Sequence, residues 1–181
     1  MDPAFLISCD QWLEIADDSE INLPSEYILT YFIGIDEYSQ KLLRAAKRAF
    51  PNDEIINLVF DQSSYGPCDF IKLISRAKFV VTNSFHGVVF SINLNIPFAV
   101  GKTLKDYGNS SAFSRMDDLL ESLGLKNRIY DGKTELNDSW LQLDFAKVND
   151  RKEKLLQSSE NYLKDALIQV LERGICEKDA L

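Results

Sequence analysis

The sequence has few of the residues from which disulfide frameworks and zinc sites are built. Its 181 residues include three cysteines and one histidine. Cys9, Cys68 and Cys176 are scattered without a CxxC pair, whereas a disulfide framework calls for an even set in a short secreted chain. We therefore expect reduced cysteines, a cytoplasmic location and no metal site, because a zinc site would need all three distant cysteines to converge on the histidine.

The chain also lacks an excess of basic residues. Lysine and arginine number 20 against 28 acidic residues, which gives a formal net charge of −8. Such a chain has no net positive field to attract nucleic acid or an anionic membrane surface, so we expect neither as a partner. An anionic small molecule is still compatible with this charge, because helix N-termini and a few basic side chains can make a pocket locally positive.

Long uninterrupted apolar runs are missing as well. The longest apolar stretch, residues 79–100, is broken by five polar residues: Asn83, Ser84, His86, Asn93 and Asn95. The start, Met1-Asp2-Pro3, lacks the basic region of a signal peptide. We expect no targeting or transmembrane segment. The hydrophobic content of 45% and the length predict one compact domain.

Strand and helix patterns alternate along most of the chain. Strand-like runs cover residues 26–32, 54–60, 78–82 and 96–100. Helical spacing begins after Asp36, at Pro67, at Ser84 and at about Phe113, and Gly124 ends the last of these helices. Such alternation favours a parallel sheet with helices on both faces, so we predict a Rossmann-like α/β domain over residues 1–148.

Residues 149–181 are predicted to form a long amphipathic helix. Apolar residues recur there at helical spacing: Leu155, Leu156, Tyr162, Leu163, Ala166, Leu167, Val170 and Leu171. This stripe predicts packing against a neighbour, either the domain itself or a further domain.

The residues that can carry chemistry gather in the segment Val80-Val81-Thr82-Asn83-Ser84-Phe85-His86-Gly87, where an apolar strand meets a helix. Ligands of open parallel sheets bind beyond the carboxyl ends of the strands, and a helix start offers free N–H groups to phosphate or carboxylate. His86 lies on the flank of the buried stripe, and Gly87 lets a ligand approach the backbone. From position alone, a histidine bonded to a core carbonyl and a simple N-cap at Ser84 explain the segment equally well.

Several short motifs follow one another between residue 2 and about residue 130. They include Asp2-Pro3-Ala4-Phe5-Leu6, Gly66-Pro67, Thr82-Asn83-Ser84-Phe85-His86-Gly87, Pro97-Phe98 and Ser114-Arg115. This order resembles the polysaccharide pyruvyl transferase family, whose members are similar to two-domain glycosyltransferases of the GT-B type. The resemblance implies that the chain is the C-terminal, donor-binding part of such an enzyme of exopolysaccharide synthesis. A missing N-terminal domain would carry much of the acceptor site, and the excised part would be inactive alone.

The resemblance also implies roles for individual residues. The donor would be phosphoenolpyruvate, with no further cofactor, and the acceptor a sugar or a lipid-linked oligosaccharide. His86 would be the catalytic general acid or the phosphate partner, and Arg115 would grip phosphate or carboxylate through two hydrogen bonds. The other substrate-binding residues would be Asn83, Ser84, Phe85, Gly87, Ser114 and Lys102.

Two other functions stay open. A nucleotide-sugar glycosyltransferase half-domain would bind a nucleotide at the same crevice and would need a carboxylate for the ribose, for which Asp106 is the one candidate. A noncatalytic interaction domain would be indicated if Asn83 and His86 were buried and bonded to the backbone, with no pocket beside them.

Several single residues have alternative roles. Arg115 could form a surface ion pair with Asp117 or Asp118, and Arg128 could form a structural salt bridge. Tyrosines near strand ends and loops could stack on a sugar or could be half-buried packing residues: Tyr31, Tyr65 and Tyr107.

Overall fold

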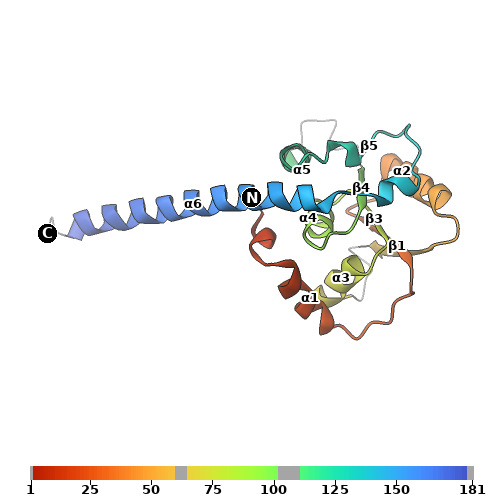
Figure 1. Cartoon of the computed structure of the whole chain (residues 1–181), viewed down its shortest axis with the longest axis horizontal. Coiled ribbons are helices and arrows are strands. Elements are labelled where there is room, and N and C mark those ends of the chain that lie inside the picture. The colour runs from red at the N-terminus through yellow and green to blue at the C-terminus, as the bar shows by residue number, and fades with distance from the viewer. Residues whose placement is uncertain (1, 60–64, 102–110, 179–181) are drawn as a thin grey trace.

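A five-stranded parallel sheet forms the centre of the molecule in a computed structural model that describes residues 2–59, 65–101 and 111–178. The strand order is β2-β1-β3-β4-β5 (Figure 1). The strands are β1 (Tyr27–Phe32), β2 (Glu54–Val59), β3 (Phe79–Thr82), β4 (Phe98–Gly101) and β5 (Ile129–Tyr130). The predicted Rossmann-like α/β fold is confirmed.

Helices cover both faces of this sheet. They are α1 (Cys9–Asp17), α2 (Glu37–Ala49), α3 (Pro67–Ser75), α4 (Phe85–Asn93), α5 (Ser111–Leu123) and α6 (Phe145–Lys178), with 3₁₀ turns at Pro3–Leu6, Lys126–Arg128 and Asp138–Leu141. α2 packs on one face, and α3, α4 and α5 pack on the other. The reason is the strand order. The chain moves across the sheet in one direction from β1 to β2 and in the other direction from β2 to β3, β4 and β5, and right-handed crossovers then place the connecting helices on opposite faces.

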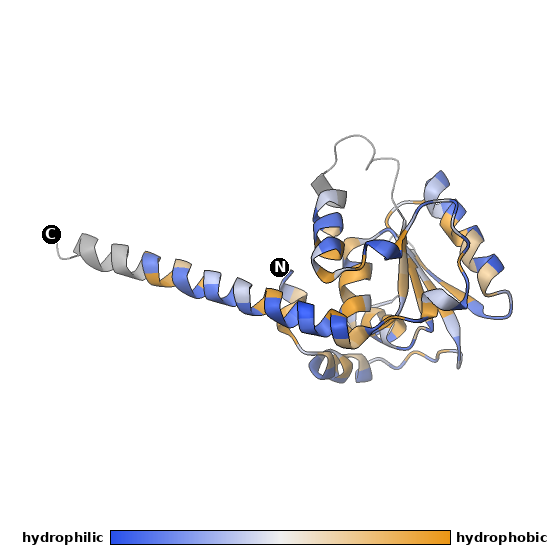
Figure 2. Ribbon diagram, turned by 45° about the horizontal axis from the view of Figure 1, so that its top comes forward, coloured by the Kyte–Doolittle hydropathy of each residue, from blue (hydrophilic) through white to orange (hydrophobic). Residues whose placement is uncertain are grey.

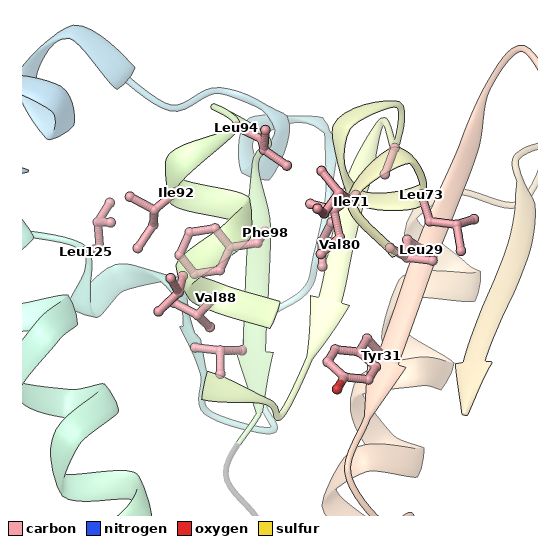
Figure 3. Close-up of a cluster of buried hydrophobic side chains, with 14 of the residues drawn as sticks. Leu29, Tyr31, Ile71, Leu73, Val80, Val88, Ile92, Leu94, Phe98 and Leu125 are labelled. Atoms are coloured by element: carbon pink, nitrogen blue, oxygen red, sulfur yellow. The ribbon is translucent and has the colours of Figure 1, made fainter. Parts of the chain in front are cut away.

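The two faces of the sheet bury different side chains of the same strands. In β1, Tyr27, Leu29 and Tyr31 join the larger apolar cluster, which includes Val88 of α4 (Figure 3). Ile28 and Phe32 point the other way and pack with α2. This alternation follows the two-residue period of a strand. Burial on both sides explains why β1 is rich in apolar and aromatic residues, and Figure 2 shows hydrophobic residues gathered where the helices meet the sheet.

Local capping fixes where the helices begin and end. The Asp36 carboxylate accepts a hydrogen bond from the Ser39 amide at 2.8 Å, as expected for the predicted start of α2. Pro67 is the first residue of α3. At the end of α5, Gly124 has a φ of +71°, the left-handed conformation that glycine adopts most readily. The predicted helix boundaries at these places are confirmed.

The first helix was not predicted, although it has a capping box. The Ser8 hydroxyl accepts from the Gln11 amide at 3.2 Å, and the Gln11 side chain accepts from the Ser8 amide at 3.0 Å. Asn93 of α4 holds the preceding segment in place by donating to the Ala4 carbonyl at 3.0 Å. These contacts bring α1, and with it Trp12, against the helices of the larger cluster.

α6 packs on the domain only along its first part. Val148 is buried, and Leu155 and Leu156 pack against the larger cluster. Farther along, where Figure 1 shows the helix leaving the body, four residues of the predicted stripe are exposed: Tyr162, Leu163, Leu167 and Val170. The side chain of Leu171 lies outside the described residues, and the domain boundary at residue 148 stays a prediction. In residues 2–59, 65–101 and 111–178, no helix has both the length and the apolar character needed to cross a bilayer.

Candidate active site at the carboxyl ends of the strands

The loops after β1 and β3 flank the point where the chain changes direction in the sheet. β1 and β3 are hydrogen-bonded neighbours, yet β1 leads into α2 on one face and β3 leads into α4 on the other. Their loops therefore diverge at this point of the sheet. Open α/β sheets bind ligands at such a switch point.

The Asn83 side chain bridges these two loops. Its oxygen accepts a hydrogen bond from the Ile33 amide at 2.7 Å. Its nitrogen donates to the Gly34 carbonyl and to the Ser39 hydroxyl, each at 3.2 Å. The protein itself thus uses the polar atoms of Asn83, which gives this residue a structural role. Its predicted contact with substrate stays a prediction.

Gly87 lies where α4 comes closest to the sheet. A Cβ atom at this position would lie 2.5 Å from Thr82 Oγ1 and 3.1 Å from Tyr31 Cδ1. Thr82 Oγ1 is held there because it donates to the Tyr31 carbonyl at 2.6 Å and accepts from the Ser84 amide at 2.9 Å. Close packing of α4 on β1 and β3 therefore requires glycine here, a reason different from the predicted approach of a ligand.

The first turn of α4 has polar groups that the described residues do not use. The Ser84 hydroxyl accepts from the Gly87 amide at 3.4 Å, and the first bond of the helix ladder joins Val88 to Ser84. The amides of Phe85 and His86 have no acceptor in the described part of the chain. His86 is exposed, and its imidazole has no hydrogen-bond partner there either. Asn83 meets only the hydrogen-bonding part of the condition for an interaction domain, because it is half-buried, and His86 is exposed beside a cavity and does not meet it.

Arg115 and Phe85 lie together on one side of this helix start. The Arg115 guanidinium carbon is 5.1 Å from the centre of the Phe85 ring, within the range of a cation–π contact. Asp117 pairs with Lys126 at 3.3 Å, and no carboxylate of the described ranges forms an ion pair with Arg115. Both residues line a cavity of about 450 Å³. The alternative ion pair with Asp117 or Asp118 is therefore absent from this structure.

His86 faces a different cavity on the other side of the helix start. This cavity, here called the aromatic pocket, has a volume of about 500 Å³. Besides His86, its lining residues are Trp12, Tyr31, Leu58, Tyr65, Gly66, Pro67, Phe70, Ile71 and Phe90. The predicted site residues are thus divided, with Phe85 and Arg115 in one cavity and His86 in the other.

The remaining predicted residues contribute less to this geometry. Ser114 is exposed beside Arg115, and Lys102, Asp106 and Tyr107 lie outside the described residues. Within those residues, no three histidine, cysteine or acidic side chains gather closely enough to hold a metal ion. The expectation that no metal takes part stays a prediction.

Arg128 has a structural role without a carboxylate partner. It is 4% exposed and donates to the Trp140 carbonyl at 2.6 Å and to the Gln142 carbonyl. Burial lowers the pKa of its guanidinium from the ordinary value. The alternative of a structural salt bridge for this residue is wrong, because the groups that accept hydrogen bonds from Arg128 are backbone carbonyls and not a carboxylate.

The protein is an α/β protein whose parallel sheet has a switch point between β1 and β3. The unpaired amides at the start of α4 make this place a candidate site for an anionic ligand. Comparison with known families then gives a specific match, because residues 1–100 fit the family described as polysaccharide pyruvyl transferase. The chain belongs to the polysaccharide pyruvyl transferase family. The matched range includes all the lining residues of the aromatic pocket, His86 among them, and it ends before Arg115. A search of curated proteins found no match to the chain.

Proposed function

We propose that this chain binds phosphoenolpyruvate at the start of α4 and takes part in the transfer of its pyruvyl group to two hydroxyls of a sugar. Membership of the family supports a polysaccharide pyruvyl transferase role. One observation carries the choice of site: the His86 imidazole and the amides of Phe85 and His86 have no partner in the described part of the chain. These groups are donors that a phosphate or carboxylate can accept from.

Electrostatics support the same location. Phosphoenolpyruvate has a phosphate and a carboxylate, and the N-terminus of a helix has a partial positive charge of roughly half an elementary charge. The Arg115 guanidinium adds a full positive charge on one flank and forms no ion pair with an acid of the described residues, while Asp2 and Asp118 line the same cavity. A guanidinium fork matches either anionic group of the donor.

The proposed reaction leaves the oxidation states of donor and acceptor unchanged overall. The methylene carbon of phosphoenolpyruvate takes up a proton, and positive charge develops at C2. One sugar hydroxyl bonds to C2 and loses its proton, and the bond between C2 and the phosphate oxygen then breaks. A second hydroxyl of the same sugar bonds to C2 and loses its proton, which closes the ketal and leaves inorganic phosphate. In this scheme His86 donates the first proton or holds the phosphate.

Calorimetric titration of the whole chain with phosphoenolpyruvate tests the proposal. We expect binding that His86→Ala and Arg115→Ala each weaken by about 10-fold or more, because each removes a charge-assisted contact. Arg44→Ala, which removes an exposed arginine from α2, is the control and should bind as the wild type does.

Three outcomes would contradict the proposal. Binding that neither substitution weakens would place the donor elsewhere. Binding of a nucleoside diphosphate without binding of phosphoenolpyruvate would favour the glycosyltransferase alternative. The absence of binding by either ligand would overturn the donor site in this chain.

A further inference from the structure

Apart from His86, the residues that line the aromatic pocket take no part in the proposed donor chemistry. We propose that this pocket binds the acceptor sugar, with the Tyr31 hydroxyl as a hydrogen-bonding group of its lining. The inference rests on the proposed function, because it takes the donor to lie beside His86 at the start of α4. His86 lines the pocket, so a sugar held there would lie next to the donor.

The wall of the pocket is built from four aromatic rings in consecutive contact. Trp12 and Phe90 have ring centres 4.9 Å apart, Phe90 and Phe70 are 5.4 Å apart, and Phe70 and Tyr31 are 5.2 Å apart. Every contact is edge-to-face, with planes inclined by 71°, 89° and 69°. Such contacts are favourable, so the rings hold one another in place. A wall formed in advance reduces the ordering cost of binding.

These rings come from four different elements, which fixes them further. Trp12 lies on α1, Phe90 on α4, Phe70 on α3 and Tyr31 on β1. The Trp12 indole N–H also donates to the Ala4 carbonyl at 3.0 Å. The wall is therefore a product of tertiary packing and does not depend on one loop.

The Tyr31 hydroxyl has no hydrogen-bond partner in the described part of the chain, and the fully buried side-chain atoms without a partner there lie elsewhere, on Arg128 and Asn149. The residue is 7% exposed, and Figure 3 shows its oxygen pointing away from the other labelled core side chains. Tyr27, four residues earlier on the same face of β1, shows the usual arrangement, because its hydroxyl donates to the Leu73 carbonyl at 2.7 Å. Because Tyr31 lines the pocket, a ligand there can form a hydrogen bond with its hydroxyl.

The chemistry of the lining favours a sugar over the donor itself. None of its residues is aspartate, glutamate, lysine or arginine, so the pocket offers no permanent charge to an anion such as phosphoenolpyruvate. A sugar ring is neutral, with C–H faces that pack on aromatic rings and hydroxyls that bond to groups such as the Tyr31 hydroxyl and the His86 imidazole. The volume of about 500 Å³ is within the range of small-molecule sites.

The test uses the whole chain and a panel of methyl glycosides of glucose, galactose, mannose and N-acetylglucosamine. Saturation-transfer NMR identifies binding, and titration gives the dissociation constants. We expect at least one glycoside to bind and Tyr31→Phe to weaken it by roughly 3- to 10-fold, the loss of one hydrogen bond. The unfolding midpoint should hardly change, because that hydroxyl has no partner in the described part of the protein.

Tyr27→Phe is the matched control, because it removes a hydroxyl that does have a partner in the protein. It should lower the unfolding midpoint and leave glycoside binding unchanged. Phe90→Leu, which removes a ring from the middle of the wall, should weaken glycoside binding. If Tyr31→Phe and Phe90→Leu both bind the glycoside as the wild type does, the sugar binds elsewhere and the inference is wrong.

Phosphoenolpyruvate titrations of the same variants separate this inference from the proposed function. If the wild type binds phosphoenolpyruvate and no glycoside, the donor site stands and the sugar pocket is overturned. If it binds a glycoside with the expected response to Tyr31→Phe and does not bind phosphoenolpyruvate, the pocket stands and the donor proposal fails. Octanoate is included as an apolar probe, and its binding in the absence of any glycoside binding would also overturn the sugar proposal.

Discussion

Gly87→Ala tests whether the space beside Gly87 serves packing or a ligand. The added methyl group would meet Thr82 Oγ1 at 2.5 Å and Tyr31 Cδ1 at 3.1 Å. Thr82 cannot retreat without losing its bonds to the Tyr31 carbonyl and the Ser84 amide. Overpacking of this kind costs about 1–3 kcal/mol, and the better helix propensity of alanine returns up to about 1 kcal/mol. We expect a net loss of about 1–2 kcal/mol in the free energy of unfolding.

Urea unfolding measures this loss, and a double-mutant cycle assigns it to the contact. Thr82→Ala removes the hydroxyl that the methyl group would strike, at its own cost of about 1–3 kcal/mol for the lost hydrogen bonds. In that background Gly87→Ala should cost less, because only the 3.1 Å contacts with Tyr31 Cδ1 and with the Cβ of residue 82 remain, so the two substitutions should couple by about 1 kcal/mol. Gly66→Ala is the control, because its added Cβ would meet only Asp69 Oδ2 at 3.7 Å. Its cost should stay below about 1 kcal/mol, the difference between glycine and alanine at an N-cap.

The opposite result would refute the packing explanation. If Gly87→Ala leaves the free energy of unfolding unchanged and weakens phosphoenolpyruvate binding, the space is reserved for a ligand, as the sequence predicted. A loss that is purely additive with that of Thr82→Ala would also contradict the structural argument, because atoms in such close contact must couple.

Two further substitutions test the structural roles found here. Arg128→Met removes the charged donor to the Trp140 and Gln142 carbonyls and should lower the free energy of unfolding by about 2–4 kcal/mol in urea, whereas a loss below about 1 kcal/mol would contradict a structural role. Asn83→Ala removes the acceptor of the Ile33 amide and should accelerate hydrogen exchange at that amide while costing about 1–2 kcal/mol. Unchanged exchange at Ile33 together with weaker phosphoenolpyruvate binding would instead make Asn83 a ligand contact.

The sequence was sufficient for most of the fold because its signals were local and strong. β1 is buried on both faces, so its apolar run stands out, and the starts of α2 and α3 are marked by Asp36 and Pro67. β5 has two residues, too few for any period, and was not predicted. The capping box of α1 is present in the sequence, and attention to it would have revealed this helix.

For the candidate site, the sequence predicted positions better than roles. Asn83 and Gly87 lie at the strand end where they were expected, but the sequence cannot show that loop atoms and Thr82 occupy the surrounding space. The aromatic pocket has almost no local signal, because its rings come from distant segments. Its lining residues are near one another in the sequence only within two stretches, residues 65–71 and the pair His86 and Phe90 on α4.

The division of the site by α4 has a consequence for the proposed chemistry. Phe85 and His86 are successive residues, about 100° apart around the helix, so their side chains face two cavities. The cavity of Phe85 is lined by charged side chains, Arg115 together with Asp2 and Asp118, whereas the aromatic pocket of His86 has no permanently charged side chain. A pyruvyl transfer needs both environments, one for an anionic donor and one for a neutral sugar. If the proposed function is right, the donor and the sugar meet at the first turn of α4. His86 is the side chain of that turn that lines the aromatic pocket, where the sugar would bind.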